Sequence, residues 1–264
     1  MPYLSLNGVE LHYTDTGGGE AIVFSHGLLF SGDMFEAQVA ALSPRYRCIS
    51  FDHRGQGKSE VAVQGYDMDT LAEDAAALIR ALDIGPCHFV GLSMGGFVGM
   101  RLAVRHPGLI RSLTLVDTSA DAEPAEKLPR YRLLSVIARW IGLWAVINRV
   151  MPIAFGQTFL NDPTRADERA RWRKAILSND RVGITRAVNG VIRRAGFYAE
   201  LPKITQPVLI IVGEEDVATV PAKSERMHEA ISGSRLVVVP GAGHSSTIEQ
   251  PVAVNEALSS FLQN

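Results

Sequence analysis

The stretch Val90-Gly91-Leu92-Ser93-Met94-Gly95-Gly96 constrains this chain most, because it follows an apolar run and precedes a run compatible with a helix. Gly-x-Ser-x-Gly in this setting is typical of a serine on a sharp turn between a strand and a helix. Gly91 and Gly95 lack a β-carbon, so strand and helix can approach each other closely around Ser93. The turn predicts a serine hydroxyl held above a sheet, near the free N–H groups of a helix that begins at Met94.

Apolar runs and helical patterns alternate through both ends of the chain. We expect strands over residues 21–25, 46–51, 87–90, 113–116, 207–213 and 235–239, and helices over residues 34–42, 70–82, 94–106, 222–231 and 251–262. Residues 3–15 predict a β-hairpin that turns at Asn7-Gly8. This alternation indicates an α/β fold built of βαβ units, with a mostly parallel sheet flanked by helices.

The alternation stops after Asp117, and no strand is expected in residues 120–196. Residues 120–200 contain 12 Arg and 2 Lys against 8 Asp and Glu, a net charge of +6, whereas the rest of the chain carries −8. This change in charge and composition predicts a core formed by residues 1–119 and 197–264, with residues 120–196 inserted as a helical lid. Residues 133–150 are the most apolar part of this lid; charges make them too short a run for a membrane span, so we expect a lid helix over a pocket.

Composition excludes several classes of protein. A chain of 264 residues, 47% hydrophobic and 20% charged, is typical of a folded domain rather than a disordered one. The net charge of −2 gives no reason to expect nucleic acid or a membrane surface as partner. Cys48 and Cys87 lie in apolar runs, which favours buried free thiols over a disulfide, and no Cys/His spacing suggests a metal site. Residues 1–5 lack the pattern of a signal peptide, so we expect a cytoplasmic protein. We also expect a monomer or a small homo-oligomer.

Five motifs lie at the ends of expected strands: His26-Gly27, Asp52-x-Arg54-Gly55-x-Gly57-x-Ser59, Gly91-x-Ser93-x-Gly95, Gly213-Glu214-Glu215-Asp216 and Gly243-His244. In this combination the chain resembles the α/β-hydrolase superfamily over nearly its whole length. Within that superfamily it is similar to small bacterial carboxylesterases and 3-oxoadipate enol-lactonases. The order serine, acid, histidine is the one that this fold uses.

The resemblance implies a catalytic triad of Ser93, Asp216 and His244. A serine hydroxyl is a poor nucleophile near neutral pH and needs an adjacent base, and histidine has a pKa suited to accepting and returning a proton. An acid must hold the imidazole in one tautomer. Asp117, at the end of the preceding strand, is an alternative acid because some members of the superfamily carry it there; as the other reading, its carboxylate caps a loop.

Backbone N–H groups stabilise the oxyanion of the tetrahedral intermediate, and the resemblance places them at Leu28 and Met94. We expect His26 and Gly27 to shape this loop and contact substrate; a direct acid–base role for His26 is the alternative. Trp140 and Trp144 are expected to contact substrate from the lid. The resemblance implies a structural turn for residues 52–59, with contact between Arg54 and substrate as the alternative.

These residues predict a serine hydrolase that cleaves a small carboxylic ester or lactone through an acyl-enzyme. No Gly-x-Gly-x-x-Gly follows the first strand, so no nucleotide cofactor is expected, and none of another kind is indicated. Ser93 argues against the dehalogenases and epoxide hydrolases of this fold, which use an aspartate there. The alternatives are an enol-lactonase, whose anionic substrate would suit the +6 lid, a perhydrolase, a C–C bond hydrolase, and a signalling receptor that keeps the triad. Leu28-Leu29 departs from the aromatic residue that perhydrolases often carry after His-Gly.

Overall fold

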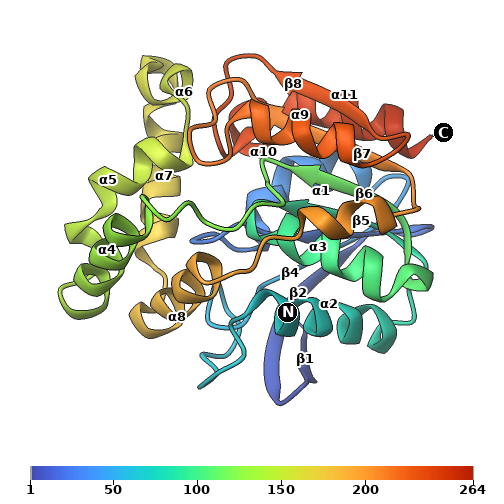
Figure 1. The fold of residues 1–264 in the computed structure, drawn as a ribbon, viewed down its shortest axis with the longest axis horizontal. Coiled ribbons are helices and arrows are strands. Elements are labelled where there is room, and N and C mark those ends of the chain that lie inside the picture. Colours follow the sequence, from blue (N-terminus) through green and yellow to red (C-terminus); the bar gives the residue numbers. More distant parts are fainter. Residues whose placement is uncertain (1, 264) are drawn as a thin grey trace.

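The computed structural model describes residues 2–263 and contains one eight-stranded sheet (Figure 1). The strand order is β1-β2-β4-β3-β5-β6-β7-β8. The pairs β1–β2 and β2–β4 are antiparallel, and the other pairs are parallel. The strands are β1 (Tyr3–Leu6), β2 (Val9–Thr16), β3 (Ala21–Ser25), β4 (Arg47–Phe51), β5 (Cys87–Leu92), β6 (Ile110–Val116), β7 (Val208–Gly213) and β8 (Arg235–Val239). This is the mostly parallel sheet that the alternating pattern predicts.

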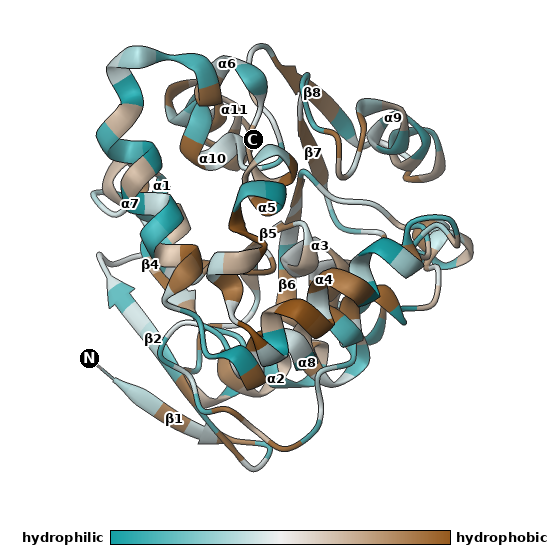
Figure 2. Ribbon diagram, turned by 90° about the vertical axis from the view of Figure 1, so that its left-hand side faces the viewer, coloured by the Kyte–Doolittle hydropathy of each residue, from teal (hydrophilic) through white to brown (hydrophobic). Residues whose placement is uncertain are grey.

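Helices cover both faces of the sheet because its central strands are apolar on both sides (Figure 2). One layer holds α2 (Met68–Ala81), α3 (Met94–Arg105) and α9 (Pro221–Ala230), and the other holds α1 (Glu36–Leu42), α10 (Ser246–Glu249) and α11 (Pro251–Leu262). In β3, Val23 faces the first layer, whereas Ile22 and Phe24 face the second. The alternation of side chains along a strand therefore supplies two hydrophobic cores from one apolar run.

The chain between β6 and β7, all of which the structure describes, contains no strand. It forms α4 (Leu128–Trp140), α5 (Ile147–Ala154), α6 (Gln157–Asn161), α7 (Ala166–Leu177) and α8 (Arg181–Ile192). These five helices, called here the helical insertion, lie together on one side of the sheet, at the left in Figure 1. Short 3₁₀ helices complete the chain at Gly32–Phe35, Pro107–Leu109, Leu143–Ala145, Pro163–Arg165 and Tyr198–Lys203.

The expectation of one lid helix over residues 133–150 is wrong. The first helix ends at Trp140, and Gly142 has a φ of +127°, a backbone conformation that breaks the helix before α5 begins. None of the helices between residues 2 and 263 is long and apolar enough to cross a membrane.

Other differences from the expected elements are local. The helix expected from Thr70 begins at Met68, because the Asp67 side chain accepts the Thr70 N–H and caps the first turn. The expected hairpin is present, with Asn7 and Gly8 both at positive φ. Cys48 and Cys87 are both buried and free, which confirms the prediction of two thiols.

The contact between the end of β3 and the start of α3 predicts a strong effect of a single methyl group. A β-carbon on Gly95 would lie 1.9 Å from the Ser25 carbonyl oxygen, whereas one on the exposed Gly108 would have no atom within 4 Å. We expect Gly95→Ala to lower the free energy of unfolding by more than about 2 kcal/mol and Gly108→Ala to change it by less than about 0.5 kcal/mol. Urea denaturation measures both; equal stabilities would contradict this packing.

Candidate active site

Ser93 lies on a strained turn at the carboxyl end of β5. Its φ of 52° and ψ of −108° are unfavourable for a residue with a β-carbon, and it caps the N-terminus of α3. Gly91 makes the turn possible, since a β-carbon there would lie 2.3 Å from the Gly95 carbonyl oxygen. The Thr118 hydroxyl donates to the Ser93 carbonyl oxygen at 2.8 Å. The Ser93 side chain makes no capping hydrogen bond to the backbone of α3, and Ser93 lines a cavity.

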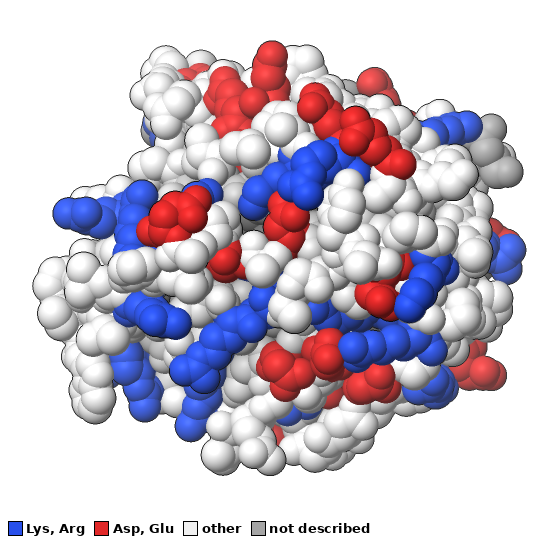
Figure 3. Space-filling model, viewed as in Figure 1, with Lys and Arg blue, Asp and Glu red and all other residues white. Residues whose placement is uncertain are grey.

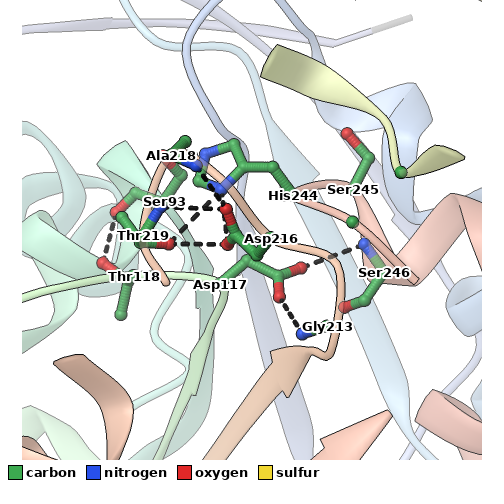
Figure 4. Close-up of polar contacts among 12 residues, drawn as sticks. Ser93, Asp117, Thr118, Gly213, Asp216, Ala218, Thr219, His244, Ser245 and Ser246 are labelled. Carbon is green, nitrogen blue, oxygen red and sulfur yellow. Dashed lines mark hydrogen bonds and ion pairs between the residues drawn. The ribbon is translucent and has the colours of Figure 1, made fainter. Parts of the chain in front are cut away.

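Ser93, His244 and Asp216 form a continuous chain of hydrogen bonds (Figure 4). The Ser93 Oγ lies 2.9 Å from His244 Nε2, and His244 Nδ1 lies 2.8 Å from Asp216 Oδ2. The three residues follow β5, β8 and β7, so the carboxyl ends of three parallel strands bring them together. An ionised Asp216 requires the proton on Nδ1, which leaves Nε2 as an acceptor facing the serine hydroxyl.

The electrostatic surroundings favour a charged pair of Asp216 and His244. Burial disfavours an ionised Asp216, but His244, two backbone N–H groups and the Thr219 hydroxyl outweigh it and lower the pKa of Asp216. Burial also disfavours an imidazolium, yet Asp216, and to a smaller extent Asp117 and Glu249, raise the pKa of His244 above its ordinary value of 6.5. The site is therefore arranged to stabilise a proton received by His244.

Asp117 holds the loops of the other two residues and makes no hydrogen bond to His244. Its Oδ1 accepts the Gly213 N–H at 2.8 Å and its Oδ2 accepts the Ser246 N–H at 3.0 Å (Figure 4). These two amides lie in the segments that carry Asp216 and His244. Burial, with the nearby Asp216 charge, raises the pKa of Asp117 to about 7. The geometry thus matches the loop-capping reading of Asp117 rather than the alternative acid.

The backbone N–H groups of Leu28 and Met94 make no hydrogen bond to any of the described residues. Gln56 links the two loops that carry them: its Oε1 accepts the Leu29 N–H at 2.9 Å and its Nε2 lies 3.8 Å from the Met94 sulfur. Leu29 has a φ of 75°, and Asn179 of the helical insertion donates to its carbonyl oxygen at 2.8 Å. One free amide therefore follows Ser93 directly at the start of α3, and the other lies in the loop after Gly27, which Gln56 and Asn179 hold from two sides.

His26 lies behind the site and does not line the cavity, unlike Gly27. Its Nε2 accepts the His53 N–H at 2.9 Å, so its Nδ1 donates to the Gly27 carbonyl oxygen at 2.7 Å. Burial lowers the pKa of His26. Both nitrogens are occupied, which leaves His26 to shape the loop and removes it from substrate contact.

Arg54 is also placed away from the cavity. Its Nε and Nη2 donate to the buried Asp74 carboxylate at 2.8 Å and 2.7 Å. Such a bidentate pair fixes the turn between β4 and α2. The position of Arg54 agrees with the structural role that the resemblance implies for residues 52–59. It does not agree with the alternative, in which Arg54 contacts substrate.

Trp140 and Trp144 lie on the outer surface of the helical insertion, 77% and 68% exposed, and neither lines the cavity. Trp140 is the last residue of α4, and Trp144 lies in the short 3₁₀ helix that follows the break at Gly142. The wall of the cavity, about 180 Å³ in volume, is made instead by the opposite side of the insertion, with Leu134, Ala138, Val146 and Val150 among its apolar residues. The expected substrate contacts of the two tryptophans are therefore corrected: smaller aliphatic residues replace them.

Two acidic residues to which the sequence analysis gave no role, Glu249 and Glu215, fasten the helical insertion to the site. Glu249 is buried and accepts the N–H groups of Gly243 and Ser245, on either side of His244, and that of Gly156 in the insertion, at 2.8–3.1 Å. Glu215, next to Asp216, accepts the Thr158 N–H at 2.9 Å. Both carboxylates are evident in the sequence near Asp216 and His244, but their partners in the insertion, Gly156 and Thr158, lie far away along the chain.

Known proteins match this chain over nearly its full length. A family model described as the alpha/beta hydrolase fold matches residues 20–251. An enol-lactonase from Burkholderia xenovorans LB400 is 32% identical, covers 100% of both chains and superposes with a TM-score of 0.93. An esterase from Thermogutta terrifontis, solved with malate bound, is 29% identical with a TM-score of 0.92, covering 99% of this chain and 97% of its own. A bromoperoxidase from Bacillus anthracis is 26% identical with a TM-score of 0.87, covering 97% and 96%.

The matched segments include the sheet and the loops that carry Ser93, Asp216 and His244. The chain belongs to the α/β-hydrolase-fold family.

Proposed function

We propose that this protein hydrolyses carboxylic esters or lactones through an acyl-enzyme formed on Ser93. The observation that carries the proposal is the hydrogen-bonded chain from Ser93 through His244 to Asp216, which ends at an apolar cavity beside two free backbone amides. Acyl transfer needs a nucleophile, a base, an acid that orients the base, and donors for the oxyanion. Each has a matching group here.

In the proposed reaction, His244 Nε2 takes the Ser93 proton as Oγ attacks the substrate carbonyl carbon. The negative charge that develops on the carbonyl oxygen is stabilised by the Leu28 and Met94 N–H groups. His244 then gives its proton to the leaving alcohol oxygen, and the C–O bond breaks to leave an acyl group on Ser93. Water, deprotonated by His244, attacks the acyl carbon, and the acid is released as the proton returns to Ser93.

The helical insertion is proposed to act as a lid over this reaction. It supplies much of the apolar wall of the cavity, which favours an apolar portion of the substrate and limits water around the charged intermediate. The similar enol-lactonase and esterase support a lactone or an ester as the bond that is cleaved. The similar bromoperoxidase favours a second candidate reaction, in which hydrogen peroxide instead of water accepts the acyl group. An assay for peracid in the presence of acetate and hydrogen peroxide tests this reaction.

Ser93→Ala should abolish turnover of p-nitrophenyl butyrate, with a loss of about 10⁴-fold or more in kcat, because the nucleophile is removed. Mass spectrometry after treatment with a fluorophosphonate should find the adduct on Ser93. Ser119→Ala is the matched control, since this serine is also buried but does not line the cavity. Turnover that persists in Ser93→Ala, with the protein folded, would refute the proposal.

The value of kcat/KM should fall toward acid pH, and the midpoint of this acidic limb should lie above pH 6.5. His244 acts as a base only when it is neutral, and its pKa is raised. Asp117 contributes to that rise, so Asp117→Asn should move the limb to lower pH, by up to about one unit. Glu225→Gln removes an exposed charge outside the site and should leave the limb in place. A limb that does not respond to Asp117→Asn would contradict this account of the pKa.

A further inference from the structure

The cavity at Ser93 carries a second group of polar side chains, which the proposed reaction does not use. They are Glu123, Tyr131, Ser135 and Arg194. Tyr131 and Ser135 come from α4, Glu123 from the segment before it, and Arg194 from the segment after α8. Most of the remaining wall is apolar, so these four side chains form a separate polar site within a hydrophobic pocket.

Phe97 connects this polar site with the nucleophile. Its backbone N–H donates to the Ser93 carbonyl oxygen at 3.1 Å, and its ring lies 4.2 Å from the Arg194 guanidinium carbon. Phe97 is in the first turn of α3, which Ser93 caps. Ser93 and Arg194 therefore both contact Phe97, and both line the same cavity.

Arg194 has donors that the protein does not use. Its side chain is only 3% exposed; Nη1 donates to Glu123 Oε2 and to the Val191 carbonyl oxygen, both at 2.9 Å. Nε is buried without an acceptor, and the hydrogen bonds of the guanidinium to the described residues all come from Nη1, which leaves Nη2 unused. Buried donors without partners are rare and unfavourable. Nε and Nη2 together are an edge of the guanidinium that matches the two oxygens of a carboxylate.

Two hydroxyl groups that line the same cavity are also unused. Tyr131 and Ser135 are four residues apart on α4, so their side chains lie on one face of the helix. Neither hydroxyl makes a hydrogen bond to another residue between positions 2 and 263. The cavity thus offers a fork of N–H donors from Arg194 and two O–H donors from the lid side.

The charges around this polar site favour an anion. Glu123 pairs with Arg194, and the charges of Lys127 and Lys223 lie close enough to act on the same region. Three cations therefore face Glu123 and Asp121, and Asp121 also pairs with Arg226. Basic side chains also gather over α4 and α8 on the lower left of the molecular face in Figure 3. A single negative charge from a ligand would be compensated here.

We propose that Arg194, with Tyr131 and Ser135, binds a carboxylate carried by the substrate, so that the preferred substrates are monoesters or lactones of short dicarboxylic acids. The inference rests on the proposed function, because it takes the cavity at Ser93 as the place where the ester bond is cleaved. One carboxyl carbon would be attacked by Ser93 while the free carboxylate, beyond a short apolar chain, accepts from the unused donors.

Three p-nitrophenyl esters of equal chain length test this: the monoester of adipate, the monoester of adipic monoamide, and the hexanoate. We expect kcat/KM for the adipate ester to exceed that for the hexanoate at least about tenfold, as charge-assisted hydrogen bonds imply. The amide, equal in shape but neutral, should fall between them. A hexanoate that is hydrolysed as well as the adipate ester would overturn the proposal.

Variants of the two adjacent arginines separate contact from general charge. Arg194→Gln should lower the adipate-to-hexanoate ratio of kcat/KM at least about tenfold, and Arg194→Lys should lower it less, because an ammonium keeps the charge but not the fork. Arg193→Gln removes the same charge from an exposed side chain that does not line this cavity, and should change the ratio less than about threefold. Equal effects of both Gln variants would overturn the assignment to Arg194.

Two further measurements keep the test independent of folding and of catalysis. If Arg194→Gln does not fold, Glu123→Gln must raise the ratio, because it removes the competing negative charge; an unchanged or lower ratio overturns the proposal. If wild type cleaves none of the esters, the proposed function fails, and calorimetry on the Ser93→Ala protein decides the inference. Binding of the adipate ester about tenfold tighter than the hexanoate supports the polar site, and equal binding overturns it.

Discussion

The rest of the site depends on one packing constraint, the close approach of the start of α3 to the ends of β3 and β5. The carbonyl oxygens of Ser25 and Gly95 occupy the space where side chains at positions 95 and 91 would begin, so only glycine permits this approach. The same closeness holds Ser93 at a positive φ, with its hydroxyl away from the backbone and the Met94 N–H unoccupied beside it. Local strain is thus stored at the residue proposed as the nucleophile, and the large apolar cores on both faces of the sheet sustain it.

Around this turn, buried carboxylates organise backbone rather than react. Asp117 joins the segments of Asp216 and His244, and Glu249 joins the His244 loop to Gly156 of the helical insertion. Charged acceptors are well suited to this, because each can satisfy several N–H groups that no regular element pairs. The position of the insertion is therefore coupled to the placement of His244, so the wall of the pocket and the groups of the proposed reaction form one connected structure.

Much of the fold and the hydrogen-bonded arrangement of Ser93, His244 and Asp216 could be predicted from short motifs, because those residues depend on local geometry. Gly91-x-Ser93-x-Gly95 encodes its own turn, and Asp216 and His244 each follow a recognisable apolar strand. Gln56, Glu249 and Arg194 could not be predicted in the same way. Each acts on a partner far away in the chain, Leu29, Gly156 and Glu123 respectively, and only the packing of helices on the sheet sets those distances. The prediction for Trp140 and Trp144 was wrong for the opposite reason: their apolar character suggested a pocket, but both side chains are largely exposed on the outer surface of the insertion.

By itself, the sequence determined the order of strands and helices, the serine turn and the chemical types that gather at one edge of the sheet. These follow from periodicity and from glycines whose role is local. Only the tertiary structure decided which side of the insertion faces the cavity, and hence that aliphatic residues and Arg194, rather than Trp140 and Trp144, line it. The physical reason is that a helix with apolar residues on more than one side has no unique inner face until it packs against the core.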